Sequence, residues 1–487
     1  MSAPTTLASP APSADGVPDV SPETPAASSD TAFGVLPLSP AALENLQRLG
    51  YERMTPIQAA SLPLALAGHD LIAQAKTGSG KTAAFALPLL AKLDAKRFAV
   101  QALVVCPTRE LAEQVTQEIR RLARAEDNVK VLALCGGSTM RPQVASLAHG
   151  AHVVVGTPGR LVDHLSRETL SLDALDTLVL DEADRMLDMG FAGEIAYVIE
   201  RCPRQRQTLM FSATYPPGVT KLAQRYMREP KQVKLAERHA ATKIRQRFYE
   251  VENDQRLQAV ALLLDHFRPA STLAFCNTRQ RCSELAALLR AQGFVALELH
   301  GELEQRDRDQ VLVQFANRSC SVLVATDVAA RGLDIAGLEA VINVDVTPDA
   351  EVHTHRVGRT GRADEAGWAF SLASRNEMER VARIEKMQGG ETEWHSLGEL
   401  TPSTDPEPLR PPMVTLQILG GRKDKIRPGD VLGALTKDLG LRAEQVGRID
   451  VAEFSTYVAV AREIARDTLR GLNAAKVKGR TVKVRKV

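Results

Sequence analysis

The residues best suited to chemistry form a glycine-rich run, Ala-Lys-Thr-Gly-Ser-Gly-Lys-Thr, at positions 75–82. This run follows the apolar segment 70–73 and opens a helical pattern, which is the context that a phosphate-binding loop requires. Its two glycines allow backbone N–H groups to curve around an anion, and the helix start adds a partial positive charge. Lys81 would reach the β- and γ-phosphates, and the Thr82 hydroxyl would bind Mg²⁺. The alternative is an ordinary glycine-rich turn, because the usual pattern begins with Gly and this one begins with Ala75.

A cluster of carboxylates further along the chain is the second candidate for chemistry. Asp181, Glu182 and Asp184 end the apolar run 178–180. Such carboxylates at a strand end suit metal binding by Asp181 and activation of an attacking water by Glu182. Taken alone, an acidic cluster is more often a solvated helix start. The preceding strand and the phosphate loop favour a site, because ligands of open α/β sheets bind at the carboxyl edge of the strands.

Alternating apolar runs and helical patterns must position these residues. Over residues 33–236 this alternation predicts a parallel sheet covered by helices. The same rhythm restarts after a polar connector and fills residues 237–399, which predicts a second α/β lobe and suggests an internal duplication. The expected strands are 102–105, 129–134, 152–155, 177–180 and 208–211 in the first lobe and 272–275, 295–299, 322–325 and 340–344 in the second.

Three other segments complete the expected organisation. Residues 1–32 hold six Pro, four acidic residues and no Lys or Arg, which predicts a disordered tail. Residues 400–412 form a Pro-rich linker. Residues 413–487 show the order strand, helix, strand, strand, helix, strand, which predicts a small ferredoxin-like α+β domain whose last strand is 481–484.

Composition excludes several classes of protein. The six cysteines contain no Cys-x2-Cys pair, so neither a zinc ribbon nor a disulfide framework is indicated. No apolar run approaches the roughly 18 residues of a membrane span, and the N-terminus lacks a signal-peptide pattern, so we expect a cytoplasmic protein without membrane contact. The net charge of +2 conceals a tail of −4 and, in residues 411–487, sixteen Lys and Arg against eight Asp and Glu, a net charge of +8.

Asp-Glu-Ala-Asp downstream of such a phosphate loop resembles the DEAD-box RNA helicases, and further motifs of that family recur in order over roughly residues 33–390. The resemblance implies two tandem RecA-like lobes and an ATP-dependent RNA helicase, an RNA-dependent ATP hydrolase that separates short duplexes locally. Residues 50–58 resemble the family's Q motif, in which Gln58 would read the adenine edge and Phe33 or Tyr51 would pack nearby. The nucleotide site would comprise these three residues with Ala75, Lys76, Thr77, Gly78, Ser79, Gly80, Lys81, Thr82 and, near the ribose, Asp334.

Loops after the predicted strands carry hydroxyl groups, guanidinium groups and open backbone N–H groups, which hold phosphates without reading bases. The resemblance implies that these loops grip the RNA backbone from both lobes, and that Ser212 and Thr214, with Asp184, couple hydrolysis to unwinding. The implied RNA-binding residues are Pro107, Thr108, Arg109, Gly137, Thr157, Pro158, Gly159 and Arg160 in lobe 1 and Asn277, Gln305, Arg308 and Thr326 in lobe 2.

The run His-Arg-Val-Gly-Arg-Thr-Gly-Arg at 355–362 matches another family motif. Arg359 and Arg362 would act as arginine fingers that stabilise charge on the γ-phosphoryl group. A helix-end cluster of salt bridges is the alternative, although acidic neighbours at helical spacing are missing. Because Lys81 and Arg359 belong to different lobes, the site must close across a cleft, which ATP and RNA together would favour.

The basic unit 413–487 resembles the C-terminal RNA-binding domain of the bacterial DbpA subfamily, which implies a 23S rRNA hairpin and pre-50S particles as partners of a monomeric enzyme. Only Tyr457 supplies an aromatic ring to a predicted strand, so we expect structured RNA to be held by basic loops and the last strand. The candidate contacts are Arg422, Lys423, Lys425, Lys476, Lys478, Arg480, Lys483 and Arg485.

Two other functions stay open at this point. One is a general cold-shock-type RNA helicase whose basic end raises affinity for any RNA. The other is an ATP-gated RNA clamp or chaperone with little turnover, against which Lys81, Glu182 and Arg359 argue.

Overall fold

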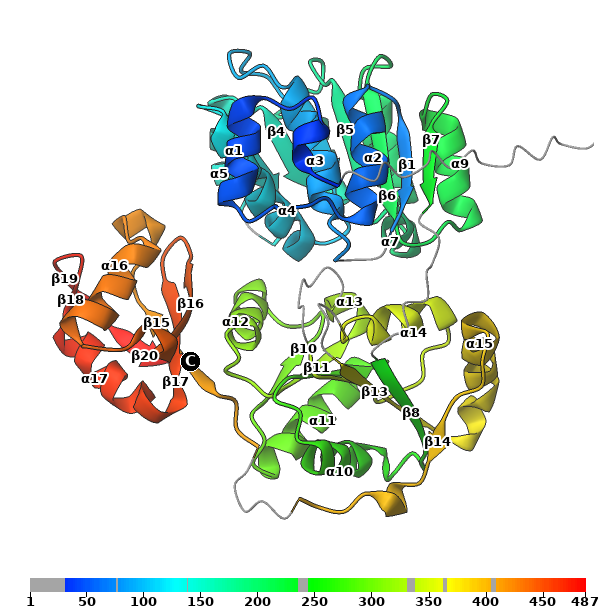
Figure 1. Cartoon of the computed structure of the whole chain (residues 1–487), viewed down its shortest axis with the longest axis vertical. Coiled ribbons are helices and arrows are strands. Elements are labelled where there is room, and N and C mark those ends of the chain that lie inside the picture. The colour runs from blue at the N-terminus through cyan, green and yellow to red at the C-terminus, as the bar shows by residue number, and fades with distance from the viewer. Residues whose placement is uncertain are drawn as a thin grey trace, which may run out of the picture.

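The computed structural model describes residues 31–75, 78–137, 139–234, 244–330, 338–361, 366–403 and 409–487. Figure 1 shows lobe 1 above lobe 2, with a smaller C-terminal unit beside lobe 2. The tail expected to be disordered lies outside the described residues, apart from its last two. Those two are ordered: Met54 N–H donates to the carbonyl of Thr31, and Ala32 forms an antiparallel bridge with Arg53.

Lobe 1 contains a seven-stranded parallel sheet in the order β3-β4-β2-β5-β6-β1-β7. Its central strands are buried along their whole length, which explains their continuous apolar runs. The strands are β1 Leu71–Gln74, β2 Ala102–Val105, β3 Val131–Leu134, β4 Val153–Gly156, β5 Thr177–Asp181, β6 Gln207–Ser212 and β7 Lys231–Lys234. The helices are α1 Pro40–Arg48, α2 Pro56–Leu66, α3 Lys81–Lys92, α4 Arg109–Leu122, α5 Met140–Ala148, α6 Pro158–Ser166, α7 Ala183–Asp188, α8 Ala192–Glu200 and α9 Pro217–Tyr226.

Lobe 2 repeats this architecture, with the strand order β10-β11-β9-β12-β13-β8-β14. Numbered from its own first strand, this is the same order as in lobe 1. The strands are β8 Ile244–Glu250, β9 Thr272–Cys276, β10 Ala296–Leu299, β11 Val322–Thr326, β12 Ala340–Asn343, β13 Gly367–Ala373 and β14 Trp394–His395. The helices are α10 Arg256–Phe267, α11 Arg279–Ala291, α12 Gln305–Ala316, α13 Asp327–Ala330, α14 Ala350–Val357 and α15 Met378–Gln388.

Equivalent helix starts strengthen the relation between the lobes. Thr108 ends the loop after β2, and its hydroxyl caps α4 by accepting from Leu111 N–H at 3.3 Å. Thr278 does the same after β9, where its hydroxyl accepts from Arg281 N–H at 3.2 Å. The shared order and shared caps support an internal duplication.

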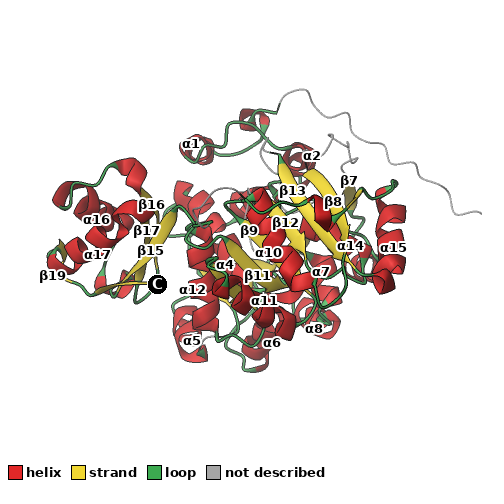
Figure 2. Cartoon of the chain, turned by 90° about the horizontal axis from the view of Figure 1, so that it is seen from below, coloured by secondary structure: helices red, strands yellow, loops and turns green. Residues whose placement is uncertain are grey.

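The C-terminal unit is an antiparallel sheet in the order β16-β17-β15-β20. The tandem RecA-like lobes and this α+β unit confirm the expected fold class. The strands are β15 Met413–Ile418, β16 Val446–Val451, β17 Thr456–Ala461 and β20 Val484–Lys486, and the helices are α16 Pro428–Gly433 and α17 Ala465–Ala474. Figure 2 shows α16 and α17 on one side of this sheet.

One expected strand of this unit, 481–484, is wrong. β18 (Lys476–Val477) and β19 (Arg480–Thr481) form a separate small hairpin, and the last sheet strand begins at Val484. The reason is the turn at Lys478 and Gly479, whose φ angles of 53° and 76° are those of a two-residue hairpin turn. By contrast, every expected strand of the two lobes is present within two residues of its expected ends.

A buried junction attaches the C-terminal unit to lobe 2. The Thr415 hydroxyl lies 2.7 Å from that of Ser319 and accepts from Asn317 Nδ2 at 3.2 Å, and Met413 N–H donates to the carbonyl of Arg318. Residues 317–319 directly follow α12, and both figures show the unit beside that helix. Residues 404–408 of the expected linker lie outside the described residues, whereas Ser403 N–H is bonded to the Asp265 carboxylate of lobe 2.

The helices of the described residues include none that is both long enough and apolar enough to cross a membrane. All six cysteines are buried and free.

Candidate functional site

The phosphate loop joins β1 to α3 at the carboxyl edge of the lobe 1 sheet. Gly80 is the N-cap of α3 with φ +90°, and a Cβ there would lie 2.5 Å from Nε2 of Gln58. Glycine is therefore required for both its backbone conformation and its lack of a side chain. Gly78 also has a positive φ, and Ala75 N–H donates to the carbonyl of Ser212 at 3.0 Å. Ser79 lies between the two glycines, whereas Lys76 and Thr77 fall outside the described residues.

Lys81 and Asp181 lie buried behind this loop, at 6% and 3% exposure. Within the described part of the chain, Lys81 Nζ and Asp181 Oδ1 have no hydrogen-bond partner. Burial raises the pKa of Asp181 to about 7, although the Lys81 charge opposes the rise. Glu182 is 5% exposed and holds a left-handed backbone with φ 51°, a conformation that non-glycine residues adopt at a cost. Thr82, in the first turn of α3, is half-buried.

A pocket of about 430 Å³ opens beside the loop, between the Q-motif segment and the glycines. Gln58 borders it, but its amide is partly engaged: Oε1 accepts from Thr55 N–H at 2.9 Å, and Nε2 donates to the carbonyl of Gly80 at 3.0 Å. The expected adenine reader therefore also ties the Q motif to the phosphate loop. The lining residues are Gly50, Tyr51, Glu52, Arg53, Thr55, Gln58, Gly78 and Gly80.

The two aromatic candidates occupy different positions. Tyr51 lines the pocket, and its hydroxyl donates to Glu118 at 2.6 Å. Phe33 is 5% exposed and meets Tyr51 edge-on, with ring centroids 6.0 Å apart. Phe33 thus supports Tyr51 from behind in this arrangement.

Asp184 connects the carboxylate cluster to the segment after β6. Its Oδ2 accepts from Thr214 Oγ1 at 2.8 Å and from Thr214 N–H at 3.0 Å, and its own N–H donates to Ser212 Oγ at 3.3 Å. Burial alone would raise the pKa of Asp184, but these hydrogen bonds outweigh it and hold the pKa below its ordinary value. The structure thus brings the three expected coupling residues together.

Lobe 2 presents α14 to this cluster, and Figure 1 shows α7 of lobe 1 facing α13 and α14. Burial and then Asp349 raise the pKa of Glu351 of α14, and Thr214, Asp184 and Asp188 of lobe 1 also act on it, so α14 lies close to this cluster. His355 has its pKa lowered to about 3 by burial, then by Arg185 of lobe 1, with smaller effects of Arg359 and Lys81. Arg359 is 6% exposed. Arg359 follows the end of α14, and both it and Lys81 act on the pKa of His355, whereas Arg362 and Asp334 lie outside the described residues.

The neighbouring arginine of the same motif has a different environment. Arg356 is buried and forms a bidentate pair with Asp327, both N–O distances being 2.7 Å, and it also donates to Asn277 Oδ1. The salt-bridge alternative therefore holds for Arg356. Its acidic partner lies on α13, 29 residues away in the chain, so helical spacing within the motif could not reveal it.

Four of the expected RNA-binding residues, two from each lobe, meet where the lobes are in contact. Arg308 forms a 3.0 Å ion pair with Glu110, and Arg109 lies 3.7 Å from Asp309. A Cβ at Gly137 would lie 3.1 Å from the Arg109 guanidinium and 3.3 Å from Gln305 Oε1, so these side chains would have to shift slightly, and the φ of +75° itself favours glycine. Glu110, which the sequence reasoning did not single out, is the acidic centre of this contact.

The other expected RNA residues are placed less uniformly. Asn277 donates to the carbonyl of Val346 and accepts from Arg356, so its amide supports the lobe 2 framework. Thr326 ends β11 and is 8% exposed. Pro107 and Thr108 precede α4, and Thr157, Pro158, Gly159 and Arg160 form the start of α6, at the same sheet edge as the phosphate loop.

The expected cations of the C-terminal unit are exposed, but they occupy several places. On the sheet, Arg485 donates to Gln417 Oε1 at 2.7 Å, and Gln417 donates to the Tyr457 hydroxyl at 3.1 Å. Lys483 precedes β20, Lys476 and Arg480 lie on the small hairpin, and Lys478 forms its turn. Arg422, Lys423 and Lys425 belong to the loop after β15.

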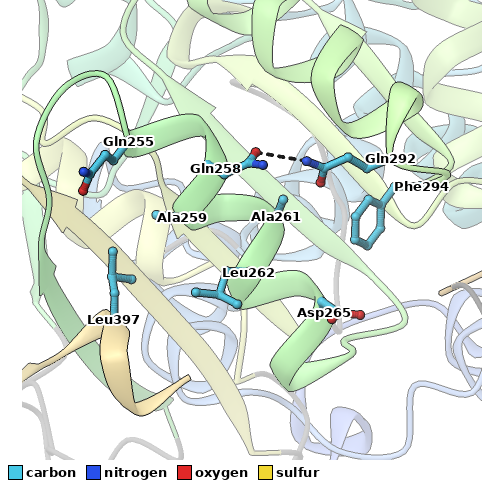
Figure 3. A pocket seen from close by; sticks show the side chains of 9 residues that line it. All are labelled: Gln255, Gln258, Ala259, Ala261, Leu262, Asp265, Gln292, Phe294 and Leu397. Carbon is cyan, nitrogen blue, oxygen red and sulfur yellow. Dashed lines mark hydrogen bonds between the residues drawn. The ribbon is translucent and has the colours of Figure 1, made fainter. Parts of the chain in front are cut away.

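A larger pocket, of about 600 Å³, lies on the outside of lobe 2. Figure 3 shows it over α10, with Phe294 and Leu397 at its sides and a hydrogen bond between Gln258 and Gln292. None of the expected site residues lines this pocket, so it is separate from the nucleotide and RNA positions.

Three family models match successive parts of the chain. Residues 55–222 match DEAD/DEAH box helicase, residues 254–364 match the helicase conserved C-terminal domain, and residues 415–486 match the DbpA RNA binding domain. S. cerevisiae Dbp5 bound to RNA and ADP BeF3 is similar in structure, with a TM-score of 0.70 and 28% identity over 76% of this chain and 96% of that one. The chain belongs to the DEAD-box ATP-dependent RNA helicases.

Curated relatives narrow the subfamily. The ATP-dependent RNA helicase DbpA of Escherichia coli (strain K12) is 50% identical over 458 residues, which cover 93% of this chain and 99% of the relative. The DEAD-box helicase CshA of Geobacillus kaustophilus is 44% identical over 357 residues, which cover 73% of this chain and 76% of the relative. The match over nearly the whole chain, including the RNA-binding domain, places it in the DbpA subfamily.

Proposed function

We propose that this ATP-dependent RNA helicase is directed to a 23S rRNA hairpin by its C-terminal unit and acts on pre-50S particles as a cytoplasmic monomer. The observation that carries this proposal is the match of residues 415–486 to the DbpA RNA binding domain, on a unit with a net charge of +8. Cations of this density neutralise RNA phosphates, and a separate anchoring domain can keep the motor near one RNA.

Mg²⁺ is proposed to accompany ATP at the carboxyl edge of the lobe 1 sheet. Buried Asp181 Oδ1 and the Thr82 hydroxyl supply the oxygen ligands that Mg²⁺ prefers, and the unpartnered Lys81 Nζ would meet phosphate oxygens. The described residues contain no group of three or more His, Cys, Asp or Glu that could hold a metal by themselves. A Mg²⁺ ion shared with ATP phosphates needs only one or two protein carboxylates. When bound, Mg²⁺ neutralises charge on the transferring phosphoryl group.

The protein's own groups divide the remaining work. Glu182, which directly follows β5 beside Asp181, would orient and deprotonate the attacking water. Arg359 would stabilise the charge that develops on the γ-phosphoryl group once α14 closes on the phosphate loop. The Asp184–Thr214 bond, which lies close to Glu351 of α14, would then couple closure of the lobes to the hydrolytic carboxylates. RNA held by both lobes would favour the same closed state, which accounts for RNA-stimulated hydrolysis.

The test compares ATP turnover by the full chain under four conditions: no nucleic acid, a 23S rRNA fragment containing the hairpin, an unrelated RNA of equal length, and DNA. We expect the largest stimulation with the 23S fragment. Equal stimulation by both RNAs would contradict the rRNA proposal, whereas equal rates under all four conditions would point to the clamp with little turnover.

A general RNA helicase is the second candidate, and the 44% identity to CshA over the motor lobes favours it. In that case, removing residues 411–487 should weaken binding to every RNA by the same factor. A loss confined to the 23S fragment would support the anchored enzyme.

A further inference from the structure

Three loops form one end of the C-terminal unit and are bonded to one another. These are the loop Gly420–Lys425 after β15, the turn Ala452–Ser455 between β16 and β17, and the turn of the small hairpin. Arg422 N–H donates to the carbonyl of Ala452 at 2.9 Å, and Lys423 N–H donates to that of Glu453 at 3.0 Å. A Cβ on Gly421 would lie 2.5 Å from the Ala452 carbonyl oxygen, so the first two backbones are in direct contact. These bonded loops therefore form a preformed surface at one end of the C-terminal unit.

Phe454 projects from this surface into solvent. It is 69% exposed, more than any other large hydrophobic side chain in the described ranges, and Leu419 close by is 49% exposed. The turn that presents it is closed by a 2.8 Å bond from Ala452 N–H to the carbonyl of Ser455, and Thr456 below it is anchored on the carbonyl of Gly420. One exposed apolar residue needs no explanation. An aromatic ring held by a rigid turn among cations is a different feature.

The charges around the ring are mainly positive. Arg422, Lys423 and Lys425 are exposed in the adjoining loop, and Lys478 reaches the carbonyl of Lys425 from the small hairpin. Three acids partly offset them: Glu453 lies 3.3 Å from Lys423, Asp430 lies 3.7 Å from Lys478, and Asp424 lies 4.0 Å from Arg480. An anion with an aromatic part would satisfy both the cations and the ring, which is the composition of a nucleotide.

This end of the unit also faces the motor. Figure 1 shows the turn between β16 and β17 pointing toward lobe 1. Arg120 of α4 has its pKa lowered first by burial and then by the charge of Arg422, so the two guanidinium groups lie close enough to repel. Arg120 itself is held by the carbonyl of Val131, to which its Nη2 donates at 2.7 Å. A phosphate between the unit and α4 would relieve this repulsion.

We propose that Phe454 is a stacking platform for an unpaired base of the bound RNA, and that Arg422 and Lys423 hold the phosphates beside that base. Aromatic side chains commonly recognise splayed RNA bases in this way, and Lys and Arg supply the backbone contacts. The site adds an aromatic contact outside the sheet, where Tyr457 is already engaged by Gln417. The inference rests on the proposed function only in taking the 23S hairpin as the RNA.

The test measures the Kd of the full chain for the 23S rRNA fragment, with 2-aminopurine placed in turn at each unpaired position. Phe454→Ala should weaken binding by about tenfold or more, because stacking of one base on an aromatic ring contributes on that scale. Fluorescence at one position should be quenched by wild type and by Phe454→Trp but not by Phe454→Ala. Arg422→Gln should lower the slope of log Kd against log salt by about one ion.

Phe98→Ala is the matched control, since Phe98 is a 57% exposed aromatic residue of lobe 1, and it should leave Kd unchanged. Basal ATP turnover without RNA should be the same in Phe98→Ala as in wild type. If wild type prefers the 23S fragment and Phe454→Ala binds it equally well, the stacking site is wrong while the proposed function stands. If wild type shows no preference for the 23S fragment, the proposed function fails. Quenching of 2-aminopurine in any RNA by wild type but not by Phe454→Ala still tests the stacking site. Unchanged RNA affinity with altered sedimentation would assign Phe454 to a protein contact and overturn the proposal.

Discussion

The hydroxyl of Thr214 donates a 2.8 Å hydrogen bond to Oδ2 of Asp184, and thereby ties the loop after β6 to the carboxylates after β5. Thr214 and Asp184 also act on the pKa of Glu351 of lobe 2, so this pair lies near the opposite lobe.

Thr214→Val removes this hydroxyl and keeps the side-chain shape. We expect RNA duplex separation to slow by roughly tenfold, since a hydrogen bond to a charged group contributes about 1.5–3 kcal/mol. ATP turnover should change much less, because Lys81, Asp181 and Glu182 are untouched. Unwinding and ATPase assays on the same preparation measure the ratio of the duplex-separation rate to the ATP turnover rate. Thr220→Val in α9 is the control, and a parallel loss of both activities would contradict a coupling role.

Asp181→Asn should stabilise the fold while abolishing ATP turnover. A carboxyl whose pKa is about 7 when folded and 3.8 in its ordinary state binds more protons in the folded protein. Stability from this group is therefore lost as pH rises from about 4 to about 7. The variant avoids that loss, so its Tm should exceed that of wild type by at least about 2–4 °C at pH 8 and by less at pH 6.

Thermal unfolding without nucleotide at the two pH values measures this difference. Asp163→Asn, whose side chain is 57% exposed, is the control. A Tm for Asp181→Asn equal to or below that of wild type at pH 8 would contradict the interpretation of the site.

The ion pair between Glu110 and Arg308 should bias the lobes toward contact before RNA binds. The Glu110 side chain is 8% exposed and the Arg308 side chain is 19% exposed. Replacing either residue by a neutral one therefore leaves its partner as a poorly solvated, unpaired charge. We expect Glu110→Gln to reduce the closed population by roughly tenfold. Fluorescence transfer between dyes on the two lobes measures it.

The double variant Glu110→Arg with Arg308→Glu should recover lobe contact but not RNA-stimulated turnover, because the phosphate-facing cation would have moved. Glu302→Gln removes an exposed pair with Arg279 within lobe 2 and serves as the control. Equal energy transfer in Glu110→Gln and wild type would refute the role of the pair.

His353 should make lobe 2 sensitive to acid. Burial lowers its pKa to about 4, and neither ring nitrogen has a hydrogen-bond partner among the described residues. Between about pH 6.5 and pH 4, His353 therefore binds a proton in the unfolded chain but not in the folded chain. The free energy of unfolding falls as pH falls through that range. In His353→Phe the new ring would lie near Phe248. Its free energy of unfolding, relative to that of wild type, should be higher at pH 5.5 than at pH 8 by about 1 kcal/mol.

Urea unfolding at both pH values measures this change. His149→Gln, at an exposed position, should leave the pH dependence as in wild type. An equal effect of His353→Phe at pH 5.5 and pH 8 would show that packing alone is responsible.

Local patterns were sufficient to predict much of this molecule. Buried parallel strands such as β2 and β5 are continuous apolar runs, and the glycine-rich loop lies between an apolar run and a helical pattern, as a phosphate loop does. The strand 481–484 was misplaced because two short pairing segments separated by Lys478 and Gly479 look like one strand in sequence. Strands β7 and β14, short and at sheet edges, carry too little apolar signal to be found, and β8 and β13, inside the lobe 2 sheet, were also missed.

By itself, the sequence determined the types of chemistry available: a phosphate loop, paired carboxylates, arginines for a second lobe, and a basic end. Those features depend on residue type and near-neighbour spacing. Only the tertiary structure decided which of them meet. It paired Arg356 with Asp327, joined Glu110 to Arg308 across the lobes, and bonded the loop of Arg422 to the turn that carries Phe454. Such contacts depend on strand order and lobe placement, which arise from packing of the whole chain. No local sequence pattern at these residues indicates them.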